Sequence, residues 1–459
     1  MPVSRHSSAL SGRGLDGNQP PHADQVIGGD GPPVEPVHAV EAAQFHLAQR
    51  PVQFAPTKDP FDQLAFALAD RASRIGPPRT KTCPWGADDN ECMETLRLRV
   101  ELENMDGPES QQALDQAAAI LRRGGTVALP TETVYGLGAN ALDAAAVAAI
   151  FAAKERPGWD PLIVHVADEA MLAGVVGEIP EAARRLIRAF WPGPLTLLLP
   201  RSKAVPDAVT AGRPLVGVRM PGHPVALEVI RRAGVPVAAP SANRFGHTSP
   251  TTAEHVLDDL DGRIDAVLDA GPTAFGVEST VLDLNTSPMI VYRPGAITLD
   301  QIREVAGPAE IFVEREALAV EPRDALPSPG VGLRHYAPRA RLILVESGDG
   351  KGSADLASRL YVEAIVFANE RVGVMLPDGM PGEHSVGESK GHFEGFAEIF
   401  LWGNWSEPEV LAQRLFAGLR QLDAAGCTVI VCPMPPDRGI GLAIRDRLRK
   451  AAWEDGSQA

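Results

Sequence analysis

Two threonines, Thr131 and Thr133, lie in the segment PTETVYGLG at residues 130–138, directly after a short apolar run. Their hydroxyl groups can donate and accept hydrogen bonds, and the glycines let a bound molecule approach backbone amides. Open α/β sheets bind ligands beyond the carboxyl ends of their strands, which is where this segment falls. The segment indicates a binding loop, and an ordinary Pro/Gly turn with polar residues is the alternative.

A lysine and an arginine two residues apart, Lys154 and Arg156, lie near the end of a helix expected to begin near Asp143. Cations in the last turn of a helix complement its dipole, so a solvated helix end is one interpretation. Lys154, however, stands one turn beyond Ile150 and Phe151, on the apolar face of the helix. An ammonium group on a buried face favours a nearby anion, and the two cations could clamp a polyphosphate.

Two further polar side chains lie on apolar strands. His165 belongs to the run PLIVHV, where a satisfied core histidine is the more common outcome. Arg219 ends the expected strand Leu215–Arg219, and a guanidinium group there is suited to bidentate capture of a carboxylate, such as that of an amino acid. We therefore expect a carboxylate site near Arg219, whereas His165 could serve the core or a ligand.

More polar groups follow at later strand boundaries. Ser241 and Asn243 come after the expected strand Val235–Ala239, and Ser279 and Arg293 lie in FGVEST and YRPG. Ser and Asn after a strand often form only a turn. Because such groups recur at strand ends within one domain, they suggest a single polar cleft.

Short strands and helices must position these groups. A helix at Gln111–Arg122 ends at a Gly-Gly pair, Pro224 marks a first helical position, and Thr251 with Glu254 forms a capping box. Strands are expected at Thr126–Leu129, Leu162–Val166, Leu195–Leu199, Leu215–Arg219, Val235–Ala239, Ala266–Asp269, Ser279–Leu284 and Met289–Tyr292. The alternation predicts a mixed α/β domain.

Residues 307–338 are rich in Pro and Gly without a sustained period, which is typical of a linker. Beyond them, strands are expected at Arg341–Val345, Arg371–Leu376 and Thr428–Val431, with one helix opened by a Ser406/Glu409 capping box and closed at Gly426, and another at Ile440–Ala452. This pattern predicts a small β/α layered C-terminal domain.

Residues 1–104 are irregular, and short helices are expected only around Pro60–Arg74 and Cys92–Asn104. We expect this segment to be mostly disordered. Because periodic structure begins after Met105, one hypothesis is that translation starts there and the upstream segment is an extension. A transit peptide is the alternative, and the early acidic residues argue against it.

Composition narrows the function classes. The chain has 459 residues, 44% hydrophobic and 22% charged, so two folded units of a globular protein are expected. A formal net charge of −16 opposes tight non-specific binding to nucleic acid, so we expect small anionic substrates instead. Four cysteines without a C-x-x-C pair fit a reducing, cytoplasmic setting, and the apolar runs are too short to predict a membrane span.

Together these strings closely resemble the threonylcarbamoyl-AMP synthase family in its long form, which has a YrdC-like domain and an extra C-terminal domain. The resemblance runs from about residue 109 to residue 453. It rests on GGTVALPTETVYGLGANA, the K-x-R-P motif at 154–157, FWPGPLTLLL, VRMPGHP, the S-x-N motif at 241–243, FGVEST, YRPG, HYAP at 335–338 and RGIGLAIRDRLRKA.

The resemblance implies an α/β fold, with a YrdC-like twisted mixed sheet and helices at residues 108–305, a linker or lid at 306–340, and a small Rossmann-like β/α domain at 341–459. It implies a nucleotidyltransferase that makes L-threonylcarbamoyl-AMP and pyrophosphate from L-threonine, bicarbonate and ATP, for tRNA threonylcarbamoyladenosine modification. It further implies Mg²⁺ bound with ATP rather than at a protein metal site, and a downstream tRNA threonylcarbamoyl transferase complex. The acidic charge balance predicts weak or no direct tRNA binding.

Carried over position by position, the resemblance also implies roles for single residues. Lys154 and Arg156 would be catalytic. The threonine site would contain Thr131, Thr133, His165, Arg219, Ala239 and Ser279, and the ATP site Lys154, Arg156, Asp160, Thr210, Ser241, Asn243, Ser249, Arg293 and Tyr336. Asp160 departs from the family, in which many members have Asn, and a carboxylate there would repel triphosphate unless it faces Mg²⁺ or solvent.

Two other functions compete with this interpretation. YrdC-like domains also occur in hydrogenase-maturation carbamoyltransferases, but those carry zinc-type cysteine pairs and further domains that this sequence lacks. A non-catalytic RNA-binding module is the other alternative, and the acidic charge balance argues against it.

Overall fold

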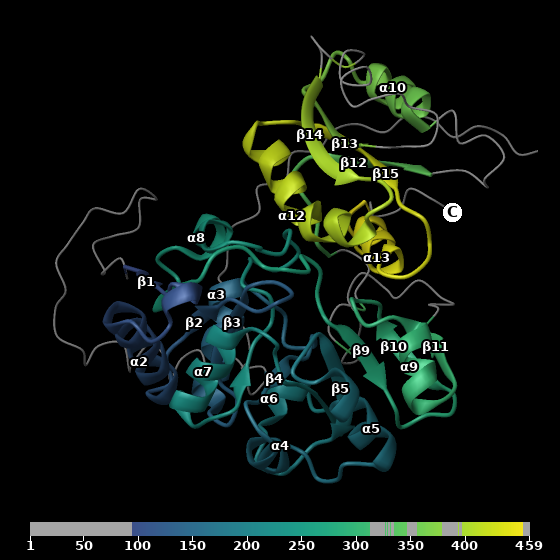
Figure 1. The fold of residues 1–459 in the computed structure, drawn as a ribbon. Coiled ribbons are helices and arrows are strands. Elements are labelled where there is room, and N and C mark those ends of the chain that lie inside the picture. The colour runs from purple at the N-terminus through teal and green to yellow at the C-terminus, as the bar shows by residue number, and fades with distance from the viewer. Residues whose placement is uncertain are drawn as a thin grey trace, which may run out of the picture. The chain divides into compact units, whose positions relative to one another are not determined.

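The computed structural model describes residues 94–312, 335–346, 356–378 and 397–452, together with the single residues Leu326, Ser328, Val331 and Phe393. Along these residues, a large mixed sheet with helices is followed by a small parallel sheet with helices of its own (Figure 1). The predicted α/β class, with a twisted mixed sheet and a smaller β/α domain, is confirmed.

The large sheet has 11 strands within the described residues, in the order β1-β8-β2-β3-β7-β4-β6-β5-β9-β10-β11. The strands are β1 (Leu96–Arg99), β2 (Val127–Leu129), β3 (Gly136–Asn140), β4 (Ile163–His165), β5 (Leu195–Pro200), β6 (Leu215–Arg219), β7 (Val237–Ala238), β8 (Ala266–Asp269), β9 (Thr280–Asp283), β10 (Met289–Arg293) and β11 (Ala309–Ile311). The sheet combines parallel pairs such as β4 with β6 and antiparallel pairs such as β5 with β6.

The centre of this sheet brings distant polar residues together. Strand β4 lies between β7 and β6, and its register places His165 opposite Arg219 on one side and Val237 on the other. Ala239 follows β7, and its backbone N–H donates to the carbonyl of Ile163 at 2.9 Å. Because side chains opposite each other in neighbouring strands lie within contact distance, the register itself makes His165 and Arg219 neighbours.

Helices cover the sheet and end where their sequences dictate. They are α2 (Pro108–Arg122), α3 (Ala144–Lys154), α4 (Glu169–Val175), α5 (Glu181–Phe190), α6 (Asp207–Thr210), α7 (Pro224–Ala233), α8 (Ala253–Leu260) and α9 (Leu299–Ala306). Helix α3 is capped at its start by Asp143, whose carboxylate accepts from the N–H of Ala145, and at its end by Glu155 in the left-handed conformation at φ 55°. This end directs the last turn, with Lys154, toward the loop after β7.

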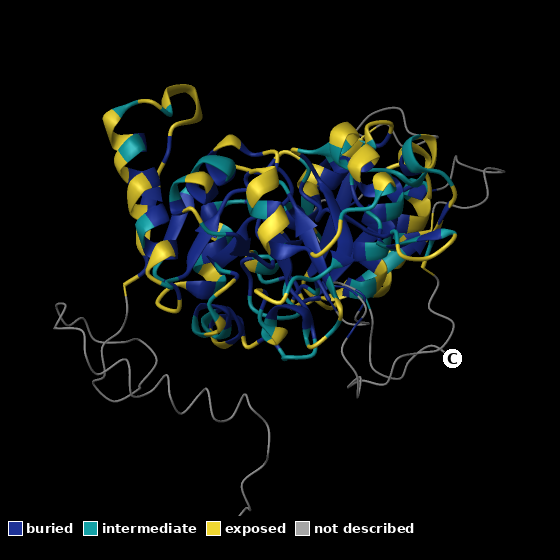
Figure 2. Ribbon diagram, turned by 90° about the horizontal axis from the view of Figure 1, so that it is seen from below, coloured by how far each residue is buried: buried dark blue, intermediate teal, exposed yellow. Residues whose placement is uncertain are grey.

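The core consists of the central strands and the inner faces of these helices. Strand β5 is buried from Leu195 to Leu199 because the sheet is covered on both faces. Figure 2 shows the strands in the colour of buried residues and the outer turns of several helices as exposed. The polar strand ends are therefore held on a rigid, well-packed framework.

Within its described residues, the C-terminal domain contains a parallel sheet of four strands in the order β12-β15-β13-β14. Its elements are β12 (Arg341–Glu346), α10 (Leu356–Val366), β13 (Val372–Asp378), β14 (Ala397–Asn404), α12 (Pro408–Ala424), β15 (Val429–Met434) and α13 (Gly441–Ala451). The central strand β15 is buried at every position, as expected for a parallel strand between helical layers.

The start of the fold differs from the prediction. We expected a disordered segment up to residue 104 with a helix near 92–104, but β1 is a strand that pairs in parallel with β8. Leu98 and Val100 are buried beside α2, so contact with the sheet decides the conformation here. A chain that started at Met105 would lack this edge strand. The expected helix at residues 60–74 lies outside the described residues.

Several elements were absent from the sequence prediction. Strand β3 runs through the Gly-Leu-Gly part of PTETVYGLG, which we expected to be loop, because β2 and β7 hydrogen-bond to its two edges. Strand β11 falls in the expected linker and pairs with β10. Helix α10 and strand β14 were also not predicted.

Two expected capping boxes are wrong. Helix α8 is capped by Thr252, whose hydroxyl accepts from the N–H of His255, one residue later than predicted. Helix α12 begins after Glu407 without a side-chain cap, and the hydroxyl of Ser406 instead donates to the side chain of Asn404 at 2.7 Å. Of the described helices, none combines the length and the apolar character that crossing a bilayer requires.

Candidate active site

A cavity lies at the strand ends where the sequence predicted polar binding residues. It is lined by residues in or next to β2, β3, β4, β6, β7, β9 and β10, by a residue after α3, and by residues of the linker. The described lining consists of Thr131, Thr133, Val134, Gly136, Arg156, Pro161, Leu162, Ile163, His165, Arg219, Ala239, Pro240, Ser241, Glu278, Ser279, Arg293, His335 and Tyr336. Segments more than 200 positions apart in the chain therefore meet around one space.

Most of the predicted site residues line this cavity. They are Thr131, Thr133, Arg156, His165, Arg219, Ala239, Ser241, Ser279, Arg293 and Tyr336. The remaining predicted residues are buried and do not belong to the described lining of the cavity. They are Lys154, Asp160, Thr210, Asn243 and Ser249. Lys154, Asp160 and Ser249 each contact a lining residue, namely Ser241, Arg156 and Glu278. Asn243 contacts Lys154, Arg244 and His247, and the Thr210 hydroxyl is buried without a hydrogen-bond partner among the described residues.

One end of the cavity is built around Arg219. Its guanidinium donates to the Thr133 hydroxyl at 3.0 Å and to the Gly193 carbonyl at 3.2 Å, and it forms an ion pair with Glu132 at 2.6 Å. The Thr131 and Thr133 hydroxyls lie 2.8 Å apart. Burial opposes ionisation of Glu132, but the charge of Arg219 together with hydrogen bonds from Arg219 and from backbone N–H groups lowers the pKa of this carboxyl. The guanidinium is therefore fixed in one orientation beside two hydroxyls.

His165 lies next to this arginine and is neutral at physiological pH. Burial, followed by the positive charge of Arg219, lowers the pKa of His165 to about 3. Its Nδ1 atom is buried and has no hydrogen-bond partner in the part of the chain that the structure describes. A neutral imidazole in this position can accept or donate one hydrogen bond to a ligand without adding charge.

A second cationic group, Arg293, forms the wall near β9. Its guanidinium donates to the backbone carbonyl of Ser279 at 3.0 Å and to its hydroxyl at 3.1 Å. The Ser279 hydroxyl also lies 2.8 Å from the hydroxyl of Thr196 on β5. Burial lowers the pKa of Arg293 from its ordinary value, but the group stays protonated because that value is so high.

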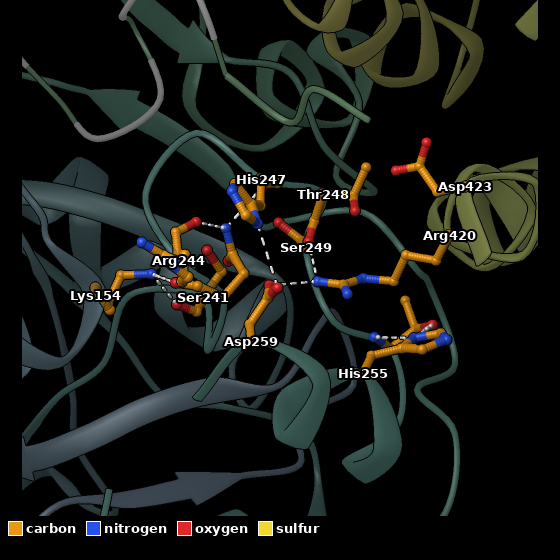
Figure 3. A network of polar contacts seen from close by, with 12 residues as sticks. Lys154, Ser241, Arg244, His247, Thr248, Ser249, His255, Asp259, Arg420 and Asp423 are labelled. Carbon is orange, nitrogen blue, oxygen red and sulfur yellow. Dashed lines mark hydrogen bonds and ion pairs between the residues drawn. The ribbon is translucent and has the colours of Figure 1, made fainter. Parts of the chain in front are cut away.

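Lys154 supports the wall from behind. Its ammonium group donates to the backbone carbonyl of Ser241 at 2.6 Å and also to that of Asn243, as Figure 3 shows for Ser241. The Asn243 amide in turn donates to the carbonyls of Arg244 at 2.7 Å and His247 at 2.8 Å. Burial, followed by the nearby charge of Arg156, holds the pKa of Lys154 well below its usual range. The lysine therefore holds the S-x-N loop against α3.

Arg156 faces the cavity and carries its own counterion. Its guanidinium forms an ion pair with Asp160 at 2.9 Å, and it donates to the backbone carbonyls of Asp160 at 3.2 Å and Pro161 at 2.9 Å. Burial raises the pKa of Asp160, while the charge of Arg156 opposes this shift. The carboxylate that seemed out of place beside a triphosphate is thus directed at an arginine of the same motif.

Three residues of the site were missed at the sequence level. Glu132 orients Arg219, Glu278 lines the cavity, and His335 stacks edge-on against Tyr336 with ring centroids 4.3 Å apart. Each lies within a motif that was noticed, namely PTET, FGVEST and HYAP. Their signal was a charged or aromatic residue next to a predicted site residue, but a single sequence does not show which of two neighbours faces a cavity.

The C-terminal domain reaches the loops that surround the cavity. Arg420 on α12 pairs with Asp259 on α8 at 2.8 Å and donates to the carbonyl of Thr248, next to Ser249 (Figure 3). Val134, which lines the cavity, and Val277, which precedes the lining residue Glu278, are buried in the same apolar cluster as the core of the C-terminal domain. The two domains therefore share the packing that holds the site.

This fold and site define a class: a mixed α/β protein whose cavity is lined by arginines and hydroxyl groups, a chemistry suited to an anionic ligand. Among the described residues, no group of three or more His, Cys, Asp or Glu side chains could hold a metal ion. The described lining offers one carboxylate, Glu278, which is already in contact with other protein groups.

Comparison with known proteins identifies the family. Residues 119–295 match the family described as "Telomere recombination", and residues 297–453 match that described as "Threonylcarbamoyl-AMP synthase, C-terminal domain". The threonylcarbamoyl-AMP synthases of Pyrococcus abyssi and Bacillus subtilis are 43% and 44% identical over 339 residues, which cover 73% of this chain and 93% and 92% of those proteins.

A solved structure agrees with the sequence relatives. The crystal structure of P. abyssi Sua5 complexed with L-threonine has 39% sequence identity and a TM-score of 0.68, and the match covers 78% of this chain and 98% of that one. The chain belongs to the threonylcarbamoyl-AMP synthase family. It is accordingly an enzyme of the nucleotidyltransferase type that makes threonylcarbamoyl-AMP.

Proposed function

We propose that the cavity holds L-threonine and ATP side by side and joins them, through bicarbonate, into L-threonylcarbamoyl-AMP with release of pyrophosphate. The observation that carries this proposal is that Arg156, Arg219 and Arg293 line one space together with hydroxyl groups. A carboxylate and a polyphosphate both need such donors, and arginine binds both bidentately.

L-Threonine binds at the Arg219 end. The carboxylate of the amino acid accepts from the guanidinium, whose orientation Glu132 already fixes at 2.6 Å, and the Thr131 and Thr133 hydroxyls complete the donors. Because His165 is neutral, its imidazole can hydrogen-bond to a polar group of the amino acid without repelling the amine when that is protonated. The P. abyssi relative was solved with L-threonine, which supports this assignment of substrate.

ATP binds at the other end, along Arg156, Ser241 and Arg293. The amine of threonine, once unprotonated, attacks the carbon of CO₂ and loses a proton to form a carbamate; with bicarbonate the same carbamate forms with loss of water. A carbamate oxygen then attacks the α-phosphorus of ATP, and the bond from that phosphorus to the bridging oxygen breaks as pyrophosphate leaves. The chain's own groups position both substrates and offset the negative charge.

Mg²⁺ enters as part of the substrate MgATP. The only carboxylate of the described lining, Glu278, is bound by a serine and an arginine, so the wall suits a metal held mainly by phosphate oxygens and water. Bound in this way, the metal neutralises phosphate charge. Arg156 and Arg293 then need only complement that charge from the protein side.

The linker closes the site. Tyr336 is 1% exposed, adopts a left-handed conformation at φ 64°, and stacks on Phe416 of α12 with ring centroids 5.7 Å apart. The cavity beneath has a volume of about 40 Å³. Small-molecule sites typically need about 300 Å³ or more. The His335–Tyr336 segment must therefore move to admit substrates, and its return shields the labile mixed anhydride from water.

The proposed reaction has a direct test. The chain is incubated with MgATP, bicarbonate and each amino acid in turn, and pyrophosphate is measured together with the adenylate product. Pyrophosphate that depends on both threonine and bicarbonate is the expected result. Release that is independent of threonine, or that is supported equally by other amino acids, would refute the assignment.

The product then serves tRNA modification through a separate transferase complex. The net charge of −16 supports weak or no direct tRNA binding by this chain, because phosphate backbones are bound by clustered cations. In a filter-binding assay with unmodified tRNA at physiological salt, we expect no saturable retention. Tight saturable binding would favour an RNA-binding role instead.

A further inference from the structure

Glu278 is an unexpected residue for a cavity that binds anions. It is 5% exposed and is the single acidic side chain among the described residues of the lining. A carboxylate in this wall opposes a carboxylate substrate and a triphosphate through like-charge repulsion. The protein must therefore compensate its charge.

The compensating group comes from the C-terminal domain. The Nε atom of Arg447, on α13, donates to the Glu278 carboxylate at 2.7 Å, although the two residues are 169 positions apart. Arg447 is fully buried and also donates to the carbonyl of Pro294 at 2.9 Å. The second carboxylate oxygen of Glu278 accepts from the Ser249 hydroxyl. Both carboxylate oxygens of Glu278 therefore have hydrogen-bond partners in the protein.

A second arginine, Arg293, binds the residue next to Glu278, donating to the carbonyl of Ser279 at 3.0 Å and to its hydroxyl at 3.1 Å. Arg293 directly precedes Pro294, whose carbonyl Arg447 binds. The positive charge of Arg293 also lowers the pKa of the Glu278 carboxyl. Without Arg447, the buried carboxylate would be left with Arg293 as its main cation. An arginine that neutralises a buried carboxylate is less available to a phosphate group.

We propose that Arg447 is a positioning residue of the active site, which pairs with Glu278 and thereby leaves Arg293 available for the phosphates of ATP. The C-terminal domain then contributes to the anion site in two ways: the charge of Arg447 compensates Glu278, and the domain covers the cavity. This inference rests on the binding of ATP in the cavity, as proposed above.

A purely structural role for Arg447 is the competing explanation. The guanidinium lies 5.3 Å from the ring centroid of Tyr336, and the loop with Glu278 packs tightly on α12, where a Cβ on Gly276 would lie 2.5 Å from the Cα of Gln413. If Arg447 acted only by filling space, removing the charge of its partner would not restore function. The charge argument predicts restoration.

The experiment therefore compares Arg447→Gln with the double variant Arg447→Gln/Glu278→Gln, in the full chain, by pyrophosphate release at varied ATP and at varied threonine. In Arg447→Gln the KM for ATP should rise about 10- to 100-fold, as is typical when one partner of a buried pair is removed. The KM for threonine should change less than about threefold, because its site is built on Arg219. The double variant should recover most of the ATP affinity.

Arg445→Gln is the matched control. Arg445 lies two residues earlier on α13 and pairs with Glu346 at 2.7 Å within the C-terminal domain. This variant should keep the KM for ATP of the wild type, which separates loss of the Glu278 pair from general damage to the helix. Arg447→Lys should fall between wild type and Arg447→Gln, because it keeps a charge but not the guanidinium geometry.

The outcomes are distinguishable. A folded Arg447→Gln variant with an unchanged KM for ATP would overturn the inference, and so would a double variant as impaired as the single one. If Arg447→Gln does not fold, a folded double variant with near wild-type KM supports the inference. A double variant that also fails to fold, or that folds with a raised KM, contradicts it. Failure of the wild type to release threonine-dependent pyrophosphate would refute the proposed function itself.

Discussion

Replacing Lys154 with methionine removes one ammonium group and leaves the apolar stem largely in place. In the folded protein this group donates to the backbone carbonyls of Ser241 and Asn243, and the side chain is 1% exposed. The change therefore removes the contact between α3 and the S-x-N loop without opening a large cavity.

The magnitude follows from those contacts. A hydrogen bond to a charged group contributes about 1.5–3 kcal/mol, so two contribute about 3–6 kcal/mol before costs. Burying an ammonium group is itself unfavourable, as the depressed pKa of Lys154 indicates, so the net loss should be about 2–3 kcal/mol. This corresponds to a decrease of roughly 30- to 150-fold in the equilibrium constant for correct placement of the loop, which is the upper limit of the loss in activity.

The assay is threonine-dependent pyrophosphate release, with urea unfolding measured on the same samples. We expect kcat/KM for ATP to fall by up to this factor in Lys154→Met, while a folded state persists. Glu155→Gln is the matched control, because Glu155 is the next residue, is exposed, and pairs only with Arg244 and Arg263 among its described ion-pair partners. A folded Lys154→Met variant within about threefold of wild-type activity would show that the lysine does not hold the loop.

Three further predictions follow from particular contacts. Asp160→Asn should leave pyrophosphate release nearly intact, because Arg156 keeps the carbonyls of Asp160 and Pro161 as acceptors; a tenfold rise in the KM for ATP would contradict this. Gly276→Ala should lower the melting temperature markedly, because the residue has φ +68° and its Cβ would meet the Cα of Gln413 at 2.5 Å; an unchanged melting curve would contradict that packing. His165→Gln should reduce the loss of folding stability on acidification. The pKa of His165 is about 3 in the folded protein and 6.5 ordinarily, so at pH values between the two the unfolded chain binds a proton that the folded chain does not. Through this group, the free energy of unfolding falls as pH drops below 6.5, by about 2 kcal/mol at pH 5. Urea unfolding at pH 7 and pH 5 measures this, and an identical pH dependence in both proteins would count against a buried neutral imidazole.

Much of the fold could be predicted because the strands are short apolar runs between clear turns. The strands Leu215–Arg219 and Ala266–Asp269 have the expected bounds, and Pro224 begins its helix as expected. Strand β3 could not be predicted, because Gly-Leu-Gly has little strand preference of its own and is a strand only through hydrogen bonds to β2 and β7. The edge strand β1 was also not predicted, because it is a strand only through its pairing with β8.

The site was predicted in its residues more than in its contacts. The sequence by itself determined which side chains are available, since hydroxyls, cations and amides recur at strand ends and their order resembles one family. Only the tertiary structure decided which of them meet: that Lys154 holds carbonyls 87 and 89 positions away, that Glu132 orients Arg219, and that Arg447 from the C-terminal domain pairs with Glu278. The physical reason is that pattern and propensity act over a few residues, whereas the pairing of buried charges depends on chain segments that become neighbours only when the core packs.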